Sequence, residues 1–206
     1  MYHVPEHFVA APLRSRFSCL ALWLACAALL PAAEEYTYWI EPCPPETART
    51  TGCQAGDPEL GRWALEAWQR EASGAIVFKK SATEEHARFR MHWVNGSSGL
   101  YGETEPTMVD GRRGANIYVL PSVAPGADAL LRDAIVYLTC LHESGHALGL
   151  VHTAAFADIM YSFQYGGDIP AYFGRYRVLL KARADIAAHS GISDADRVAL
   201  RAALRQ

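Results

Sequence analysis

Residues 142–152 read HESGHALGLVH, and this stretch decides which fold and chemistry the chain is expected to have. His142 and His146 are four residues apart, so on a helix both imidazoles project from the same face, one turn apart. Gly149 can take a left-handed conformation, which ends the helix and turns the chain sharply. The turn then brings His152 back toward the first two histidines.

Three converging imidazoles predict a zinc site. Zinc held by three protein ligands keeps a fourth position for water, which is the catalytic arrangement, whereas structural sites are usually closed by cysteine or a fourth ligand. Glu143 follows the first histidine, where its carboxylate can reach a water on the metal as a general base. We therefore expect His142, His146 and His152 to bind one catalytic Zn²⁺ and Glu143 to be the catalytic residue. A helix with merely solvated or buried histidines is the simpler alternative.

The segments around this stretch alternate between strand-like and helix-like patterns. Helices that follow strands suggest an α/β or α+β arrangement with a mixed sheet. The expected strands are residues 36–40, 76–78, 88–94 and 115–120, and the expected helices are residues 57–73, 128–148, 172–188 and 193–204. The Gly-rich stretch 95–102 is expected to be a loop, and Arg112-Arg113 a solvated turn.

The stretch 142–152 resembles the extended zinc signature of the metzincin metalloendopeptidases. These enzymes carry a methionine in a tight turn beneath the metal, and Met160 lies eight residues after His152, as in the matrixin branch. Ser193-Asp194-Ala195-Asp196 resembles the start of the closing helix of matrixins. The resemblance is close over residues 128–161 and only architectural upstream.

The resemblance implies an α+β, metzincin-like catalytic domain over residues 34–206. Its expected architecture is a twisted mixed sheet of about four to five strands packed on two long helices, with a C-terminal helix. The implied activity is that of a zinc metalloendopeptidase, which hydrolyses peptide bonds in protein or peptide substrates. Met160 would form the apolar floor of the site, and we expect the protein to be a monomer.

Two features depart from the matrixin pattern. The histidine-rich loop that holds a second, structural zinc in animal matrixins has no match, and the segment from Met160 to Ser193 is longer than usual. That segment would shape the substrate pocket, so cleavage preference cannot be carried over. Tyr161 and Phe163 are candidates for the pocket wall, and core packing explains them equally well. The substrate is expected to lie along an exposed edge strand at residues 116–120.

The first 33 residues are expected to be a secretory signal peptide. Arg14 and Arg16 precede an apolar stretch over residues 17–30, and small residues follow up to Ala33. The apolar stretch is short for a membrane-spanning helix, which needs about 20 residues. Contact with a membrane would therefore be limited to an uncleaved signal or a lipid anchor. We expect a secreted protein, extracellular or periplasmic.

The cysteines of the expected mature chain suggest one disulfide. In an exported protein, Cys43 and Cys53 are expected to pair and close a small loop. Cys140 is expected to be a buried free thiol. Two alternatives stay open: a free Cys43 thiolate that caps the zinc and holds the enzyme latent, and a non-catalytic zinc-binding protein with the same fold.

The overall charge gives no sign of a nucleic-acid partner. The 206 residues include 19 basic and 22 acidic side chains, a net charge of −3. Without a basic excess, we expect no nucleic-acid binding. Glu103, Glu105 and Asp110 are candidate ligands for Ca²⁺, although their spacing matches no established calcium-binding pattern.

Overall fold

The computed structural model describes residues 32–96, 101–121 and 128–205. All but the last two residues of the predicted signal peptide (1–33) lie outside these ranges, so the signal peptide stays a prediction. Part of the predicted loop 95–102 also lies outside them. In the described part of the chain, no helix is long and apolar enough to cross a membrane.

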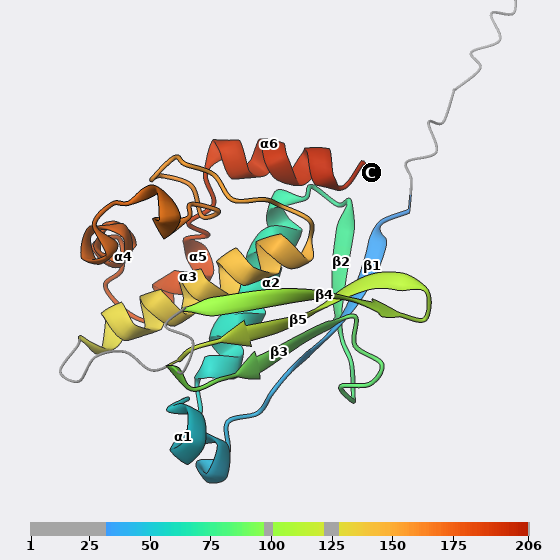
Figure 1. Cartoon of the computed structure of the whole chain (residues 1–206), viewed down its shortest axis with the longest axis horizontal. Coiled ribbons are helices and arrows are strands. Elements are labelled where there is room, and N and C mark those ends of the chain that lie inside the picture. The colour runs from blue at the N-terminus through green and yellow to red at the C-terminus, as the bar shows by residue number, and fades with distance from the viewer. Residues whose placement is uncertain (1–31, 97–100, 122–127, 206) are drawn as a thin grey trace, which may run out of the picture. The chain divides into compact units, whose positions relative to one another are not determined.

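Five strands of the described chain form one mixed sheet in the order β2-β1-β3-β5-β4 (Figure 1). They are β1 (Glu34–Ile40), β2 (Ile76–Lys80), β3 (Phe89–Trp93), β4 (Gly102–Val109) and β5 (Arg112–Val119). β1 pairs in parallel with β2 and β3, and β3 pairs in parallel with β5. β4 runs antiparallel to β5 and forms one edge of the sheet. The predicted mixed sheet is therefore confirmed.

Two long helices cover one face of this sheet. The helices of the described residues are α1 (Pro45–Thr51), α2 (Asp57–Glu71), α3 (Ala129–Ala147), α4 (Ile169–Arg177), α5 (Asp185–Ala188) and α6 (Asp194–Ala203). α2 packs beside α3, with α2 against β1 and β2, and α3 against β4 and β5. Figure 1 shows α2 and α3 behind the sheet and α6 along the top of the view. The α+β class is confirmed.

The core lies between the sheet and the two long helices. Because successive side chains of a strand point to opposite faces, every second residue of the central strands faces the helices. These buried residues are Tyr36, Tyr38 and Ile40 of β1, Phe89, Met91 and Trp93 of β3, and Ala115, Ile117 and Val119 of β5. Trp68 of α2 is fully buried, and its indole nitrogen donates to the carbonyl oxygen of Leu141 in α3 at 2.9 Å. This bond ties the two helices together.

The edge strand beside α3 is β4, so the prediction of an exposed edge at residues 116–120 is wrong. Those residues belong mostly to β5, which lies between β3 and β4. Arg112 and Arg113 do not form the turn either, because Asp110 and Gly111 make it with positive φ angles and the arginines begin β5. β4 has no alternating apolar pattern because it is an edge strand whose side chains are mostly exposed, and it contains a proline.

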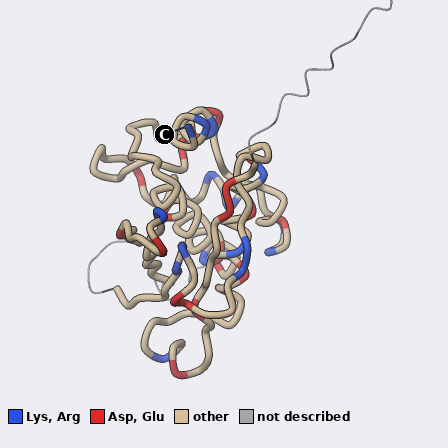
Figure 2. The backbone as a smooth tube through the Cα atoms, turned by 90° about the vertical axis from the view of Figure 1, so that its right-hand side faces the viewer, with Lys and Arg blue, Asp and Glu red and all other residues tan. Residues whose placement is uncertain are grey.

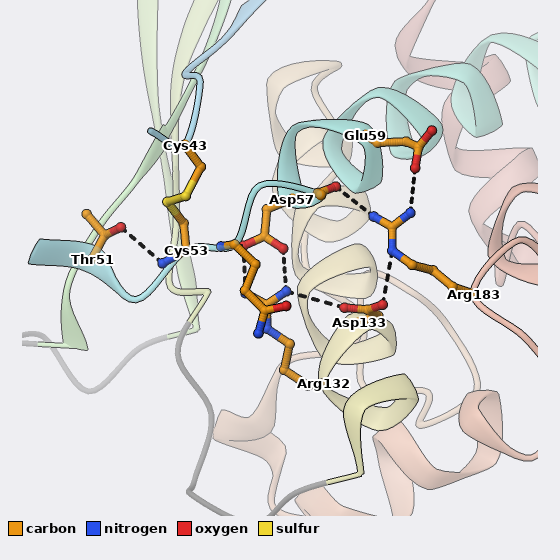
Figure 3. Close-up of polar contacts among 10 residues, drawn as sticks. Cys43, Thr51, Cys53, Asp57, Glu59, Arg132, Asp133 and Arg183 are labelled. Atoms are coloured by element: carbon orange, nitrogen blue, oxygen red, sulfur yellow. Dashed lines mark hydrogen bonds and ion pairs between the residues drawn. A yellow bond between two sulfur atoms is a disulfide. The ribbon is translucent and has the colours of Figure 1, made fainter. Parts of the chain in front are cut away.

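The predicted disulfide is confirmed. Cys43 and Cys53 are bonded, with their Cα atoms 6.1 Å apart, and the loop that they close contains α1 (Figure 3). The bonded Cys43 offers no thiolate to a metal, so the structure contradicts the hypothesis of latency through that residue. Cys140 is a buried free cysteine, as expected.

The predicted helix over residues 172–188 is two helices, α4 and α5, separated by a turn. α4 begins earlier than predicted, because the Asp168 carboxylate caps it by accepting from the backbone nitrogen of Ala171 at 3.0 Å. Apolar residues at helical spacing run across the break because both helices bury them in the same core. These residues are Tyr172, Tyr176, Leu180 and Ile186.

A buried ion pair joins the start of α2 to the start of α3. The Arg132 guanidinium makes two hydrogen bonds to the Asp57 carboxylate, one of them 2.6 Å long, and both side chains are buried (Figure 3). Arg183 extends the network by pairing with Asp133 at 3.1 Å and with Glu59. Elsewhere, basic and acidic residues are interspersed along the described chain, as Figure 2 shows.

Candidate metal centre

Three histidines converge at the C-terminal end of α3. The Nε2 atom of His146 lies 3.1 Å from that of His142 and 3.0 Å from that of His152, and the remaining distance is 3.2 Å. Among the described residues, this is the one group of three or more histidine, cysteine or acidic side chains placed to hold a metal ion. The structure therefore brings together all three histidines of the predicted ligand set.

Gly149 makes the turn that returns the chain to the metal site. Its φ of 98° lies in the left-handed region, as the sequence analysis predicted. Its backbone nitrogen donates to the carbonyl oxygen of His146 at 2.8 Å, and that of Leu150 donates to Gly145 at 3.0 Å. This pair of bonds is the Schellman arrangement that ends many helices at glycine. His152 follows directly from it.

Backbone carbonyl groups orient two of the imidazoles. Nδ1 of His142 lies 2.7 Å from the carbonyl oxygen of Ile159, and Nδ1 of His146 lies 2.9 Å from that of Leu150. A carbonyl oxygen can only accept, so each Nδ1 carries the hydrogen and each Nε2 presents its lone pair to the centre of the cluster. Burial lowers the pKa of His142 to about 4 and also lowers the pKa of His146 and His152. All three imidazoles are therefore kept neutral, the state that metal binding requires.

The spacing of the cluster fits a small divalent cation. Nitrogen ligands about 2.0–2.1 Å from a tetrahedral Zn²⁺ are about 3.3 Å apart, and the three Nε2 atoms lie within a few tenths of an ångström of that spacing. Three lone pairs that point at one another repel unless a cation lies among them. Imidazole nitrogen suits several transition metals. The finding is a cluster of three histidines placed to hold a metal ion, and zinc is the predicted ion.

Glu143 lies beside the histidines, between α3 and the edge strand β4. Its side chain is buried, and its Oε2 accepts a hydrogen bond from the Thr104 hydroxyl at 2.7 Å. Burial raises the pKa of Glu143 to about 7, against the opposing effect of the Thr104 hydrogen bond. A pKa near neutrality suits a group that accepts a proton and returns it.

The C-terminal helix holds the loop beneath the histidines. Asp196 of α6 is buried, and its carboxylate accepts from the backbone nitrogens of Ile159 at 2.8 Å and Met160 at 3.3 Å. The same carboxylate completes the predicted capping box with Ser193. Met160 is fully buried, and a methyl group added at Gly145 would lie only 2.5 Å from its sulfur. The methionine therefore packs directly against the face of α3 at Gly145.

A cavity of about 700 Å³ opens beside the metal site. Its walls come from β4, from α3, and from the long segment that follows Met160. They include the three histidines and Glu143, together with Tyr101, Gly102, Thr104, Pro106, Leu138, Thr139, Tyr161, Phe163, Ile169, Tyr172 and Phe173. Tyr161 and Phe163 thus line the cavity, and both also pack on Tyr172, with ring centroids 5.8 and 5.2 Å away. The two interpretations of these residues, pocket wall and core packing, are compatible.

The structure does not gather the candidate calcium ligands. Glu103, Glu105 and Asp110 are exposed, and in the described residues they belong to no cluster placed to hold a metal ion. Glu105 instead accepts a hydrogen bond from the hydroxyl of Tyr118, at 3.2 Å.

Sequence reasoning missed the residues of β4 that contact Glu143. Thr104 and Gly102 touch its side chain only because β4 pairs with β5 and lies across α3. No local pattern marked them, since β4 was not predicted as a strand. The capping box at residues 193–196 was found, but its link to Met160 depends on how α6 packs.

Comparisons with known proteins add no family to this description. No protein-family model matches the sequence, and none of the curated proteins matches it. The fold and the site define an α+β protein with three histidines placed to hold a metal ion, two of them at the end of its second long helix.

Proposed function

We propose that this protein is a secreted, zinc-dependent endopeptidase of the metzincin type, similar to the matrixins. The observation that carries the proposal is the juxtaposition of three neutral imidazoles and one buried carboxylate, Glu143, in a single open cavity. A purely structural zinc would need neither the carboxylate nor the cavity. The confirmed disulfide and the predicted signal peptide support an extracellular or periplasmic location.

Zinc, when bound, would act as a Lewis acid that lowers the pKa of a water molecule and polarises a carbonyl group. His142, His146 and His152 would hold it through their Nε2 atoms. Glu143 would accept a proton from the attacking water and then deliver it to the amine that leaves. Met160 would support α3 from below without taking part in the reaction.

The substrate would bind along β4, which replaces the edge expected from the sequence. Gly102, Glu103, Thr104 and Pro106 line the cavity, and on the side away from β5 the backbone of β4 has no strand partner among the described residues. A peptide in extended conformation can add to such an edge through backbone hydrogen bonds. Backbone hydrogen bonds depend little on the sequence of the substrate. Selectivity would therefore come from the aromatic side of the cavity, which would favour a large apolar side chain of the substrate.

The proposal is tested by measuring zinc content together with cleavage of an unstructured protein, for the wild type and for Glu143→Gln. We expect one zinc per chain in both, and cleavage that falls by about 10²-fold or more in the variant. Zinc in both proteins without cleavage by the wild type would instead favour a non-catalytic zinc-binding protein. Cleavage that survives in the variant would remove Glu143 from its role.

A further inference from the structure

Two residues of β4 lie close to the side chain of Glu143: Thr104 donates a hydrogen bond to it, and Gly102 leaves room for it. The Thr104 hydroxyl lies 2.7 Å from Oε2 and 2.9 Å from the carbonyl oxygen of the same glutamate. Gly102 lies so close that an added β-carbon would be 2.7 Å from Cγ and 2.8 Å from Oε1 of Glu143. The absence of a side chain at residue 102 therefore leaves the space that this carboxylate occupies.

We propose that Thr104 and Gly102 are positioning residues for Glu143: Thr104 anchors Oε2, and Gly102 leaves the room that the side chain needs. The inference rests on the proposed peptidase function and assigns part of the catalytic arrangement to the strand along which the substrate would lie. It concerns the place of the carboxylate, and neither residue touches the reacting atoms.

The hydrogen bond from Thr104 distinguishes the two oxygens of Glu143. In the described residues no side chain or backbone group donates to Oε1, whereas Oε2 accepts from the hydroxyl. Oε1 is thus the oxygen available to take a proton from water and to give it to the leaving amine.

Gly102 matters for the same glutamate because any side chain at position 102 would occupy the space that Glu143 needs. A methyl group at this position would overlap Glu143 and would also lie 2.9 Å from Cγ2 of Thr139 on α3. β4 is held by its pairing with β5, so the flexible glutamate side chain would give way first. Alanine at 102 should therefore displace Glu143, and it leaves the three histidines themselves unchanged.

The test compares Thr104→Val, Thr104→Ser and Gly102→Ala with the wild type and with Thr107→Val. Thr107 is a matched control because it lies on the same strand but outside the residues that line the cavity, and its hydroxyl is buried without a hydrogen-bond partner among the described residues. Each protein is measured for zinc content, for kcat and KM on an unstructured protein substrate, and for the position of Glu143 in a crystal structure without added metal.

We expect Thr104→Val and Gly102→Ala to keep zinc and to lose about 10- to 100-fold in kcat, because a displacement of about 1 Å can cost that much. KM should change little, Thr104→Ser should recover most of the rate, and Thr107→Val should match the wild type. The crystal structures should show the Glu143 carboxylate displaced in both impaired variants. An unmoved carboxylate, or a kcat within twofold of the wild type in both, would overturn the inference. A wild type without activity would overturn the proposed function itself.

Discussion

The candidate site has two sides that differ in how the chain assembles them. The side formed by α3 and its turn takes all three histidines and Met160 from residues 142–160, so neighbouring residues build it. The side formed by β4 brings Thr104 to Glu143 across 39 positions of the sequence. Under the proposed function, the first side would hold the metal, and the second would position the base and the substrate. A substitution on one side should therefore affect metal binding, and a substitution on the other side should affect the position of Glu143, without each changing the other.

The largest effect is expected on the helix side. His146→Ala removes one of three ligands, so the protein should lose zinc and with it the stabilisation that zinc provides. That stabilisation is about 4 kcal/mol at a zinc concentration 1,000 times the Kd. The measurement is the thermal midpoint of each protein with and without zinc. His92→Ala is the control, because His92 stacks on Tyr118 in β5, on the sheet. Equal responses to zinc in the two variants would contradict the assignment.

The helix side also depends on how the start of α3 is anchored. Asp57→Ala removes both short hydrogen bonds of the buried Arg132 guanidinium and leaves it only a 3.3 Å contact with Asp133, so we expect a loss of about 3 kcal/mol or more in the free energy of unfolding. Glu35→Ala breaks an exposed pair with Lys79 and should cost less than about 1 kcal/mol. Urea unfolding of both variants gives the comparison. Similar losses of unfolding free energy in the two variants would show that the buried ion pair stabilises the fold no more than the exposed one.

A third prediction concerns the strand side alone. If the substrate pairs with β4, methylation of a backbone nitrogen next to the scissile bond should lower kcat/KM by about tenfold, the cost of about 1.4 kcal/mol for a lost hydrogen bond. The same methyl group placed far from the scissile bond should have little effect. Peptides with these two modifications, cleaved by the wild-type protein, provide the measurement. Equal values of kcat/KM for the two methylated peptides would contradict binding of the substrate along β4.

The smallest effect is expected where α6 docks on α2. Arg197 donates to Glu71 at 2.6 Å, and this hydrogen bond lowers the pKa of Glu71 below its usual 4.5. A lowered pKa stabilises the fold above pH 4.5, and this stabilisation is lost as the pH falls through the lowered pKa. Glu71→Gln should therefore cost less than about 1 kcal/mol at pH 7 and less still in acid. A cost that grows as the pH falls would contradict this reasoning. Glu66→Gln, on the same helix, is the control.

The same contrast explains what the sequence could predict. The histidine cluster follows from spacing along one helix and from one glycine, so the convergence of His142, His146 and His152 and the conformation of Gly149 agree with the prediction, while metal binding stays a prediction. The sheet core followed from alternating apolar residues. β4 could not be predicted, since an exposed edge strand has no apolar face, and the contact of Thr104 with Glu143 depends on strand pairing. The break between α4 and α5 was missed because both helices share one apolar pattern.

The most direct test of the metal centre is the zinc K-edge absorption spectrum of the purified wild-type protein. We predict one zinc per chain with three nitrogen ligands at about 2.0–2.1 Å and one oxygen ligand. In His146→Ala this signal should disappear. A sulfur ligand at about 2.3 Å, or an unchanged spectrum in His146→Ala, would contradict a three-histidine zinc site.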